Sequence, residues 1–200
     1  MIKEKLGHRI DGWIHTAFPF LFWRPVPPDA MTVAGTLIAG GAGLAFAQGA
    51  LLAGGLLLIV GGFFDLVDGV VARHFGIATR FGAFLDSSLD RVVDILAMLG
   101  LVVFYERAGE SGWALVCASI LVATVLTSYA KARAELLIER MPGGLLERGE
   151  RIGLLAIGSV TGLLEPVLVV LVFGSCVTVG QRFLYAYREM ARLDREDEQA

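Results

Sequence analysis

Four carboxylates lie within or beside apolar segments of the chain, where a charged side chain needs a partner. Asp65 and Asp68 are three residues apart in one segment, and Asp86 and Asp90 are four residues apart in the next. On a helix, either spacing places both side chains on one face. A lone charge inside a membrane costs about 2.5 to 3.5 kcal/mol on the gentler scales, so four together require partners of opposite charge.

Oxygen ligands from two facing helices suit a hard divalent cation such as Mg²⁺ or Mn²⁺. Mg²⁺ commonly completes its coordination shell with substrate phosphates, so the aspartates also predict a phosphorylated ligand. Gly69, Ala72 and Gly82 leave room for such a ligand against the backbone. The guanidinium of Arg73 can pair with its phosphate. The alternative is a structural network neutralised by arginines, but that alternative does not explain the small residues.

The surrounding sequence is typical of a membrane protein. Of the 200 residues, 56% are hydrophobic and only 18% are charged, whereas soluble domains carry roughly a quarter charged residues. We expect an all-α, polytopic membrane protein with six transmembrane helices, the first capped by Asp29. These helices are expected over residues 30–48, 50–73, 82–105, 113–140, 147–164 and from 167 past 187. The net charge of −3 gives no reason to expect a nucleic-acid partner.

The distribution of basic residues predicts how the helices are oriented. An even number of spans places both termini on one side, and that side receives nearly all lysines and arginines of the loops and termini. Only Arg107 lies in the loops of the opposite side. We therefore expect a multi-pass protein of the cell membrane with its termini and active site on the cytoplasmic side. Residues 1–24 are expected to form an amphipathic surface helix, residues 25–188 the six-helix domain, and residues 189–200 a charged tail.

The carboxylates belong to a longer pattern that resembles the signature of the CDP-alcohol phosphatidyltransferase family at every position. The pattern reads Asp65-x2-Asp68-Gly69-x2-Ala72-Arg73-x8-Gly82-x3-Asp86-x3-Asp90. Members of that family transfer a phospho-alcohol group from a CDP-linked donor to an acceptor hydroxyl and release CMP. The resemblance implies a homodimer with two bound ions, Mg²⁺ or Mn²⁺, and Asp90 as general base. It implies metal ligation by Asp65, Asp68, Asp86 and Asp90, and a CDP-lipid site made by Asp29, Thr32, Gly69, Ala72, Arg73 and Gly82.

A second group of charged residues lies toward the cytoplasmic ends of the last three expected helices. Its members are Lys131, Arg133, Arg148, Arg151 and Arg182. Cations that converge from three helices would form an anion site, which favours a phosphate-bearing acceptor. Taken singly, they could also be ordinary basic residues at the membrane edge. The segments around Lys131 and Arg151 resemble the phosphatidylinositol-phosphate synthases of the family, in which such residues bind the phosphate of inositol phosphate.

The predicted reaction transfers a phosphatidyl group from a lipid of the CDP-diacylglycerol type to inositol 1-phosphate and releases CMP. Glycerol 3-phosphate is the alternative acceptor, because it also carries phosphate and would need the same cations. A divalent-cation transporter is the alternative from another class, since carboxylates inside a membrane also mark ion pathways. The aspartates lie near one end of their helices with no polar continuation toward the other side, which favours the enzyme.

Overall fold

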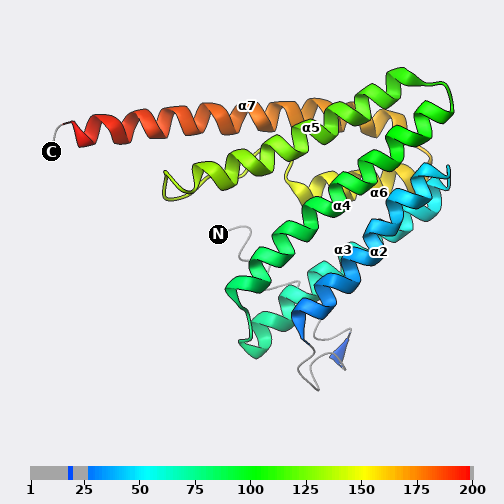
Figure 1. The fold of residues 1–200 in the computed structure, drawn as a ribbon, viewed down its shortest axis with the longest axis horizontal. Helices are drawn as coiled ribbons and strands as arrows, with labels where there is room; N and C mark the ends of the chain where they lie inside the picture. The colour runs from blue at the N-terminus through cyan, green and yellow to red at the C-terminus, as the bar shows by residue number, and fades with distance from the viewer. Residues whose placement is uncertain (1–17, 20–26, 199–200) are drawn as a thin grey trace.

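The structure, a computed structural model, describes residues 18–19 and 27–198. Within these ranges the chain forms helices and no strand, which confirms the all-α prediction (Figure 1). The helices are α2 (Pro28–Ala47), α3 (Leu51–Phe75), α4 (Arg80–Arg107), α5 (Ser111–Ala134), α6 (Arg148–Thr161) and α7 (Leu164–Asp197). The amphipathic helix that the sequence predicts over residues 1–24 lies, but for residues 18–19, outside the described ranges.

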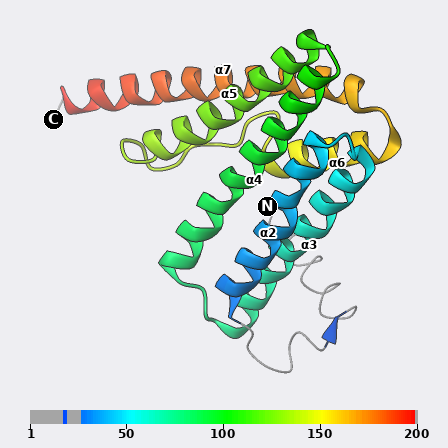
Figure 2. The ribbon, with the colours of Figure 1, turned by 45° about the vertical axis from the view of Figure 1, so that its right-hand side comes forward.

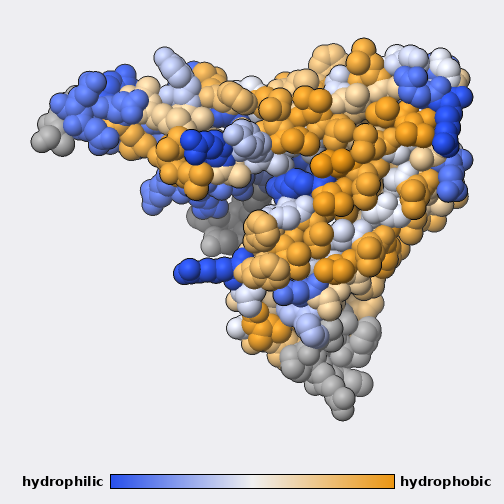
Figure 3. All heavy atoms as spheres, in the orientation of Figure 1, coloured by the Kyte–Doolittle hydropathy of each residue, from blue (hydrophilic) through white to orange (hydrophobic). Residues whose placement is uncertain are grey.

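Four of these helices, α2, α3, α5 and α7, are long and apolar enough to cross a membrane. Their composition indicates a membrane protein, and Figure 3 shows a broad apolar surface over the middle of the molecule. Helix α6 has only 14 residues, about 21 Å of length, which is shorter than the hydrocarbon core of about 30 Å. Helix α4 carries several charged residues of the site described below. The number of six spans therefore stays a prediction.

Small residues allow α2 to pack closely against α3 and α4. A side chain at Gly100 of α4 would meet the backbone of Gly43 on α2. A side chain at Gly61 of α3 would likewise meet Ala39 of α2. Close backbone approach through small residues is a common way for helices to associate in lipid. The approach of α3 and α4 to α2 brings the acidic segments of α3 and α4 together.

The remaining helices complete the bundle on one side of this trio. Helix α5 packs along α7 and against α4, and the short α6 lies between α3 and α7 (Figures 1 and 2). The α2–α3, α4–α5 and α6–α7 turns gather at one end of the bundle, on the right of Figure 1. The α3–α4 turn and the connection between α5 and α6 lie toward the other end. The candidate site lies at this second end.

Two helices begin two residues earlier than the sequence predicts. The sequence predicts that Asp29 caps a helix beginning at residue 30, but α2 begins at Pro28 and Asp29 lies within its first turn. Proline is well suited to that place, since its missing N–H is not needed there. Helix α4 begins at Arg80, because the side chain of Thr79 accepts a hydrogen bond from the Gly82 N–H at 2.8 Å and caps it.

Two further helices, α5 and α7, differ from the prediction in length. Helix α5 ends at Ala134 and not at residue 140. Residues 189–197, predicted as a separate tail, continue α7 as helix, which projects beyond the bundle in Figure 1. Arg192 forms ion pairs with Glu189 at 2.6 Å and Glu196 at 2.5 Å, which support an exposed helix. The inner face of this extension packs against residues that follow α5.

Candidate active site

Three carboxylates converge between α3 and α4. Asp65 of α3 faces Asp86 and Asp90 of α4, and one oxygen from each lies within 4.8 Å of the others. The Asp65 side chain is 35% exposed and that of Asp90 is 16% exposed. Oxygens at this spacing, partly open to solvent, suit a divalent cation that takes further ligands from a substrate. We call these three residues the acidic cluster.

Asp68 lies one turn along α3 and is not one of the three. It is 6% exposed, and its Oδ2 accepts a hydrogen bond from Thr32 Oγ1 of α2 at 2.5 Å. The sequence predicts Asp68 as a metal ligand and Thr32 as a residue of the CDP-lipid site. The structure brings the two into direct contact, so any ligand of one lies beside the other. Their individual roles stay predictions.

A cavity of about 180 Å³ opens beside Asp68, and we call it the signature cavity. Its wall contains all of the predicted CDP-lipid residues, namely Asp29, Thr32, Gly69, Ala72, Arg73 and Gly82. Asp86 of the acidic cluster also lines it. A Cβ atom at Gly82 would lie 2.9 Å from Asp29 Oδ1, so glycine allows the start of α4 to approach α2. Residues that the sequence pattern relates by spacing alone therefore share one cavity.

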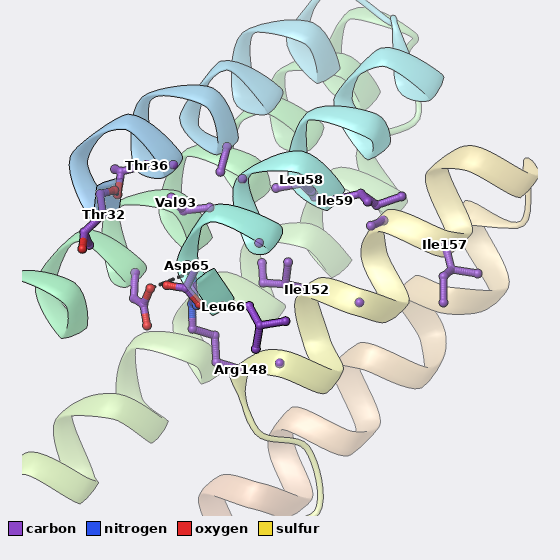
Figure 4. A pocket seen from close by; sticks show the side chains of 18 residues that line it. Thr32, Thr36, Leu58, Ile59, Asp65, Leu66, Val93, Arg148, Ile152 and Ile157 are labelled. Atoms are coloured by element: carbon purple, nitrogen blue, oxygen red, sulfur yellow. Dashed lines mark hydrogen bonds and ion pairs between the residues drawn. The ribbon is translucent and has the colours of Figure 1, made fainter. Parts of the chain in front are cut away.

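A larger cavity of about 460 Å³ leads away from the acidic cluster between α2, α3 and α6, and we call it the apolar groove (Figure 4). Asp65, Asp90 and Arg148 line its polar end. Much of the remaining wall is apolar, including Leu58, Ile59, Val93, Ile152 and Ile157. A passage that is apolar along its length and charged at one end suits an amphiphilic ligand.

Arg148 of α6 reaches into the acidic cluster, as Figure 4 shows for Arg148 and Asp65. Its Nη1 lies 3.2 Å from Asp65 Oδ2, and its Nη2 lies 2.8 Å from Asp90 Oδ1. The sequence predicts Arg148 as an acceptor-binding residue and gives no sign of these contacts. Arg148 is 83 residues from Asp65 along the chain, so only the packing of α6 against α3 brings the two together.

Asp94 is a site residue to which the sequence pattern assigns no role. It is 4% exposed, and its Oδ2 accepts a hydrogen bond from Arg151 Nη2 at 3.2 Å. Its Oδ1 lies 3.7 Å from the Nε of Arg148. The four-residue interval from Asp86 to Asp90 recurs from Asp90 to Asp94, and this repetition is the one feature of the sequence that places Asp94 on the site face of α4.

The other predicted acceptor residues differ in their surroundings. Arg182 of α7 is 7% exposed and donates a hydrogen bond to the Thr127 carbonyl of α5. The Nζ of Lys131 lies 3.9 Å from Glu135, and the lysine side chain is 44% exposed. Arg133 is exposed at the end of α5. The structure thus places Arg182 inside the bundle, as it does Arg151, while Lys131 and Arg133 lie at its surface.

The charges of the site are unequal. Five aspartates occur here, namely Asp65, Asp68, Asp86, Asp90 and Asp94. Arg148 and Arg151 form ion pairs with these aspartates, and Arg91 lies 3.7 Å from Asp90. Unpaired carboxylates in partly buried surroundings are unfavourable. The excess of negative charge agrees with the geometry of the acidic cluster in favouring a divalent metal.

Known proteins resemble this chain over most of its length. A family model described as CDP-alcohol phosphatidyltransferase matches residues 26–185. The archaetidylinositol phosphate synthase of Methanothermobacter thermautotrophicus is 35% identical over 171 residues, which cover 82% of this chain and 85% of that protein. The phosphatidylinositol phosphate synthase of Streptomyces avermitilis is 37% identical over 192 residues, which cover 88% of this chain and 78% of that protein.

The fold is also similar to crystal structures of the Mycobacterium tuberculosis phosphatidylinositol phosphate synthase. The structure with CDP-DAG bound has a TM-score of 0.75 and 28% sequence identity, covering 92% of this chain and 94% of that chain. The complex with manganese and citrate has a TM-score of 0.72 and 30% identity, covering 81% and 83%. The signature cavity, the acidic cluster and the matched family model together lead to one conclusion: the chain is an enzyme that belongs to the CDP-alcohol phosphatidyltransferase family.

Proposed function

We propose that this enzyme transfers a phosphatidyl group from a CDP-activated lipid of the CDP-diacylglycerol type to inositol 1-phosphate and releases CMP. The observation that carries the proposal is the position of the acidic cluster between two cavities. Asp65 and Asp90 line the apolar groove, whereas Asp86 lines the signature cavity. A ligand that fills both cavities would therefore place its middle at the carboxylates.

A CDP-linked lipid has the shape that this arrangement requires. Its nucleotide would lie in the signature cavity, where Arg73 can pair with phosphate. Its acyl chains would follow the apolar groove, and its pyrophosphate would lie at the acidic cluster. The crystal structure of the M. tuberculosis relative with CDP-DAG bound supports this choice of donor. A divalent-cation transporter finds no such support, because it would not need either cavity.

Asp65, Asp86 and Asp90 are the proposed metal ligands, with Asp68 as the fourth carboxylate. Mg²⁺ or Mn²⁺ suits an all-oxygen site, and the manganese complex of the M. tuberculosis relative supports this assignment. We propose two ions, since four carboxylates exceed what one Mg²⁺ needs when substrate oxygens also bind it. Bound metal supplies charge neutralisation at the phosphoryl oxygens and at the departing CMP.

Asp90 is the proposed general base. Its carboxylate lies at the polar end of the groove and takes the proton of the acceptor hydroxyl as that oxygen bonds to the lipid-linked phosphorus. The bond between this phosphorus and the bridging oxygen breaks, and CMP leaves with the bond's electron pair. Arg148, 2.8 Å from Asp90, orients the carboxylate toward the acceptor side. Within the described residues no serine–histidine or cysteine–histidine pair that would form a covalent intermediate occurs at the site.

The acceptor is proposed from the buried cations. Arg151 and Arg182 are 6% and 7% exposed, and buried guanidinium groups near a substrate cleft favour an anionic group such as phosphate. The names of the archaeal and bacterial relatives favour an inositol phosphate over glycerol 3-phosphate. We propose a cytoplasmic active site, because basic residues gather at the end of the bundle that holds the site and basic residues favour the cytoplasmic side. The homodimer that the resemblance implies stays a prediction.

The test is a product assay with the purified protein in lipid nanodiscs. CDP-diacylglycerol is incubated with radiolabelled inositol 1-phosphate, glycerol 3-phosphate or inositol, each with Mn²⁺, Mg²⁺ or EDTA. We expect a labelled phosphatidylinositol phosphate and an equal amount of CMP with inositol 1-phosphate and metal only. Product from glycerol 3-phosphate alone would change the acceptor, and full turnover in EDTA would refute the metal assignment.

A further inference from the structure

Asp94 is a buried carboxylate to which the proposed mechanism assigns no role. It lies on α4 one helical turn beyond Asp90 and is 4% exposed. Its neighbours Val93 and Ala97 on α4 belong to the hydrophobic core. A carboxylate in such surroundings is unfavourable unless it is paired and hydrogen-bonded. Its partners therefore indicate why a carboxylate occurs at this position.

Both partners come from the first turn of α6. Arg151 Nη2 donates to Asp94 Oδ2 at 3.2 Å, and the Nε of Arg148 lies 3.7 Å from Asp94 Oδ1. The two arginines are three residues apart and share one face of the helix. Arg151 also donates from Nη1 to the Leu146 carbonyl at 3.2 Å, which fixes its guanidinium on a second side. One carboxylate thus lies between two guanidinium groups and hydrogen-bonds that of Arg151.

The two arginines serve different parts of the site. The Nη atoms of Arg148 reach Asp65 at 3.2 Å and Asp90 at 2.8 Å, in the acidic cluster. Arg151 is buried and bonds the Leu146 carbonyl, and the Leu146 N–H donates to Thr178 of α7. Thr178 lies one turn before Arg182, the other buried arginine proposed for the acceptor phosphate. Asp94 therefore connects the proposed reaction centre to the proposed acceptor site.

The contact between Asp94 and Arg148 is incomplete. Among the described residues, Asp94 Oδ1 and Arg148 Nε are buried and form no hydrogen bond. They face each other at 3.7 Å, just beyond hydrogen-bond length, and a shift of about 1 Å would close the gap. Hydrogen bonds at active sites are often long in the free enzyme and tighten with substrate. Such a tightening would let Asp94 hold the Nε of Arg148 while its Nη atoms turn from Asp65 to a substrate phosphate.

We infer that Asp94 is a positioning residue for the phosphate of the acceptor. It acts through Arg148 and Arg151 and does not itself touch the substrate. The inference rests on the proposed function, since it takes inositol 1-phosphate as the acceptor. If the ion pair were merely structural, its loss would lower the stability of the protein. It would not change the affinity for the acceptor more than the affinity for the donor.

Steady-state kinetics on Asp94→Asn distinguishes these two roles. The amide keeps the shape of the side chain but loses its charge. We expect the KM for inositol 1-phosphate to rise about tenfold, the effect of weakening one charge-assisted hydrogen bond, and the KM for CDP-diacylglycerol to stay unchanged. Asp94→Glu keeps the charge and is expected to recover most of the affinity for the acceptor. An unchanged acceptor KM in Asp94→Asn, or an equal rise in both KM values, overturns the inference.

A double-mutant cycle tests whether Asp94 acts through Arg151. We expect Asp94→Asn combined with Arg151→Gln to show the same acceptor KM as Arg151→Gln alone, because residues of one network do not act additively. If the effects of the two substitutions on the acceptor KM multiply, Asp94 does not act through Arg151. The double variant has no unpaired charge at this hydrogen bond. If Asp94→Asn alone does not fold, the acceptor KM of the double variant can still be compared with that of Arg151→Gln.

Ser159→Ala is the matched control on α6. Ser159 is buried like Asp94, at 4% exposed, but among residues 18–19 and 27–198 its hydroxyl bonds only the Leu155 carbonyl of its own helix. This variant should leave both KM values unchanged. A wild-type enzyme that makes no product from inositol 1-phosphate would refute the proposed function. Active wild-type enzyme together with an unaltered acceptor KM in Asp94→Asn would refute the role of Asp94 alone.

Discussion

Arg148 of α6 and Asp90 of α4 form the shortest ion pair of the acidic cluster, with 2.8 Å between Nη2 and Oδ1. The same guanidinium contacts Asp65 of α3 at 3.2 Å, so one cation joins three helices. Asp65 and Asp90, two of the proposed metal ligands, therefore already contact a side chain that is always charged. A divalent ion bound to these carboxylates would repel the guanidinium, and the two cations must compete for them.

This competition predicts that Arg148→Gln binds divalent metal more tightly in the absence of substrate. We expect the affinity for Mn²⁺ to rise about tenfold, a change of about 1.4 kcal/mol. Electron paramagnetic resonance of free Mn²⁺ during a titration measures it directly. Arg91→Gln is the control, because Arg91 lies 3.7 Å from Asp90 and its side chain is 36% exposed, so its effect should be smaller. Weaker or unchanged binding in Arg148→Gln would contradict the competition.

The proposed base predicts a different result for Asp90→Asn than for Asp65→Asn. Loss of the proton acceptor should lower kcat about 10²-fold to 10⁴-fold, the usual contribution of general base catalysis. Binding of CDP-diacylglycerol, measured by calorimetry in detergent, should largely survive in Asp90→Asn. It should weaken in Asp65→Asn, since the metal proposed to bind there would anchor the pyrophosphate. Equal loss of donor binding in both variants would mean that Asp90 serves chiefly as a metal ligand.

Gly82→Ala is predicted to weaken binding of the donor. The added Cβ would lie 2.9 Å from Asp29 Oδ1 and 3.1 Å from Thr79 Oγ1, so the Asp29 carboxylate must shift where it lines the signature cavity. Overpacking of this kind costs about 1 to 3 kcal/mol, and we expect the donor KM to rise about fivefold or more. Gly180→Ala in α7 is the control, because nothing lies within 4 Å of its added Cβ. Alanine there should leave the kinetics unchanged and slightly favour the helix.

The acidic cluster could be predicted because its geometry is largely local. A spacing of four residues on one helix fixes a common face for Asp86 and Asp90, and a short turn returns the chain from α3 to α4. The contacts of the arginines could not be predicted in this way. Arg148 lies 83 residues from Asp65, and Arg182 lies 55 residues from its partner Thr127. Such contacts depend on how the helices pack, which spacing along the chain does not specify.

The length of α7 could not be predicted from the sequence pattern for a similar reason. Its charged end has the composition of an exposed tail, yet Ala186, Met190 and Leu193 pack against residues that end or follow α5. Of those residues, Ala134 and Ile138 lie in the helix that the prediction continues to residue 140, and Met141 directly follows it. The apolar stripe on α7 can be recognised as a packing face only when the position of the residues that follow α5 is known.

Burial distinguishes the proposed acceptor cations from one another. Arg182 is 7% exposed, and among the described residues its Nε forms no hydrogen bond. The Lys131 side chain is 44% exposed and lies 3.9 Å from Glu135. Solvent and salt screen an exposed charge far more than a buried one. Arg182 should therefore contribute more to the binding of an acceptor phosphate than Lys131.

Arg182→Gln is predicted to raise the acceptor KM about tenfold to a hundredfold. A charge-assisted hydrogen bond is worth about 1.5 to 3 kcal/mol, and each 1.4 kcal/mol corresponds to about one decade in affinity. Lys131→Gln should raise the same KM about threefold, because solvent screens its charge. Arg192→Gln is the control and should change nothing, because Arg192 is exposed near the end of α7 and paired with Glu189 and Glu196. The measurement is steady-state kinetics with each substrate varied in turn, and the donor KM should stay constant throughout. If the acceptor KM is unchanged in both Arg182→Gln and Lys131→Gln, these cations do not bind the acceptor, and a neutral polyol becomes the better candidate.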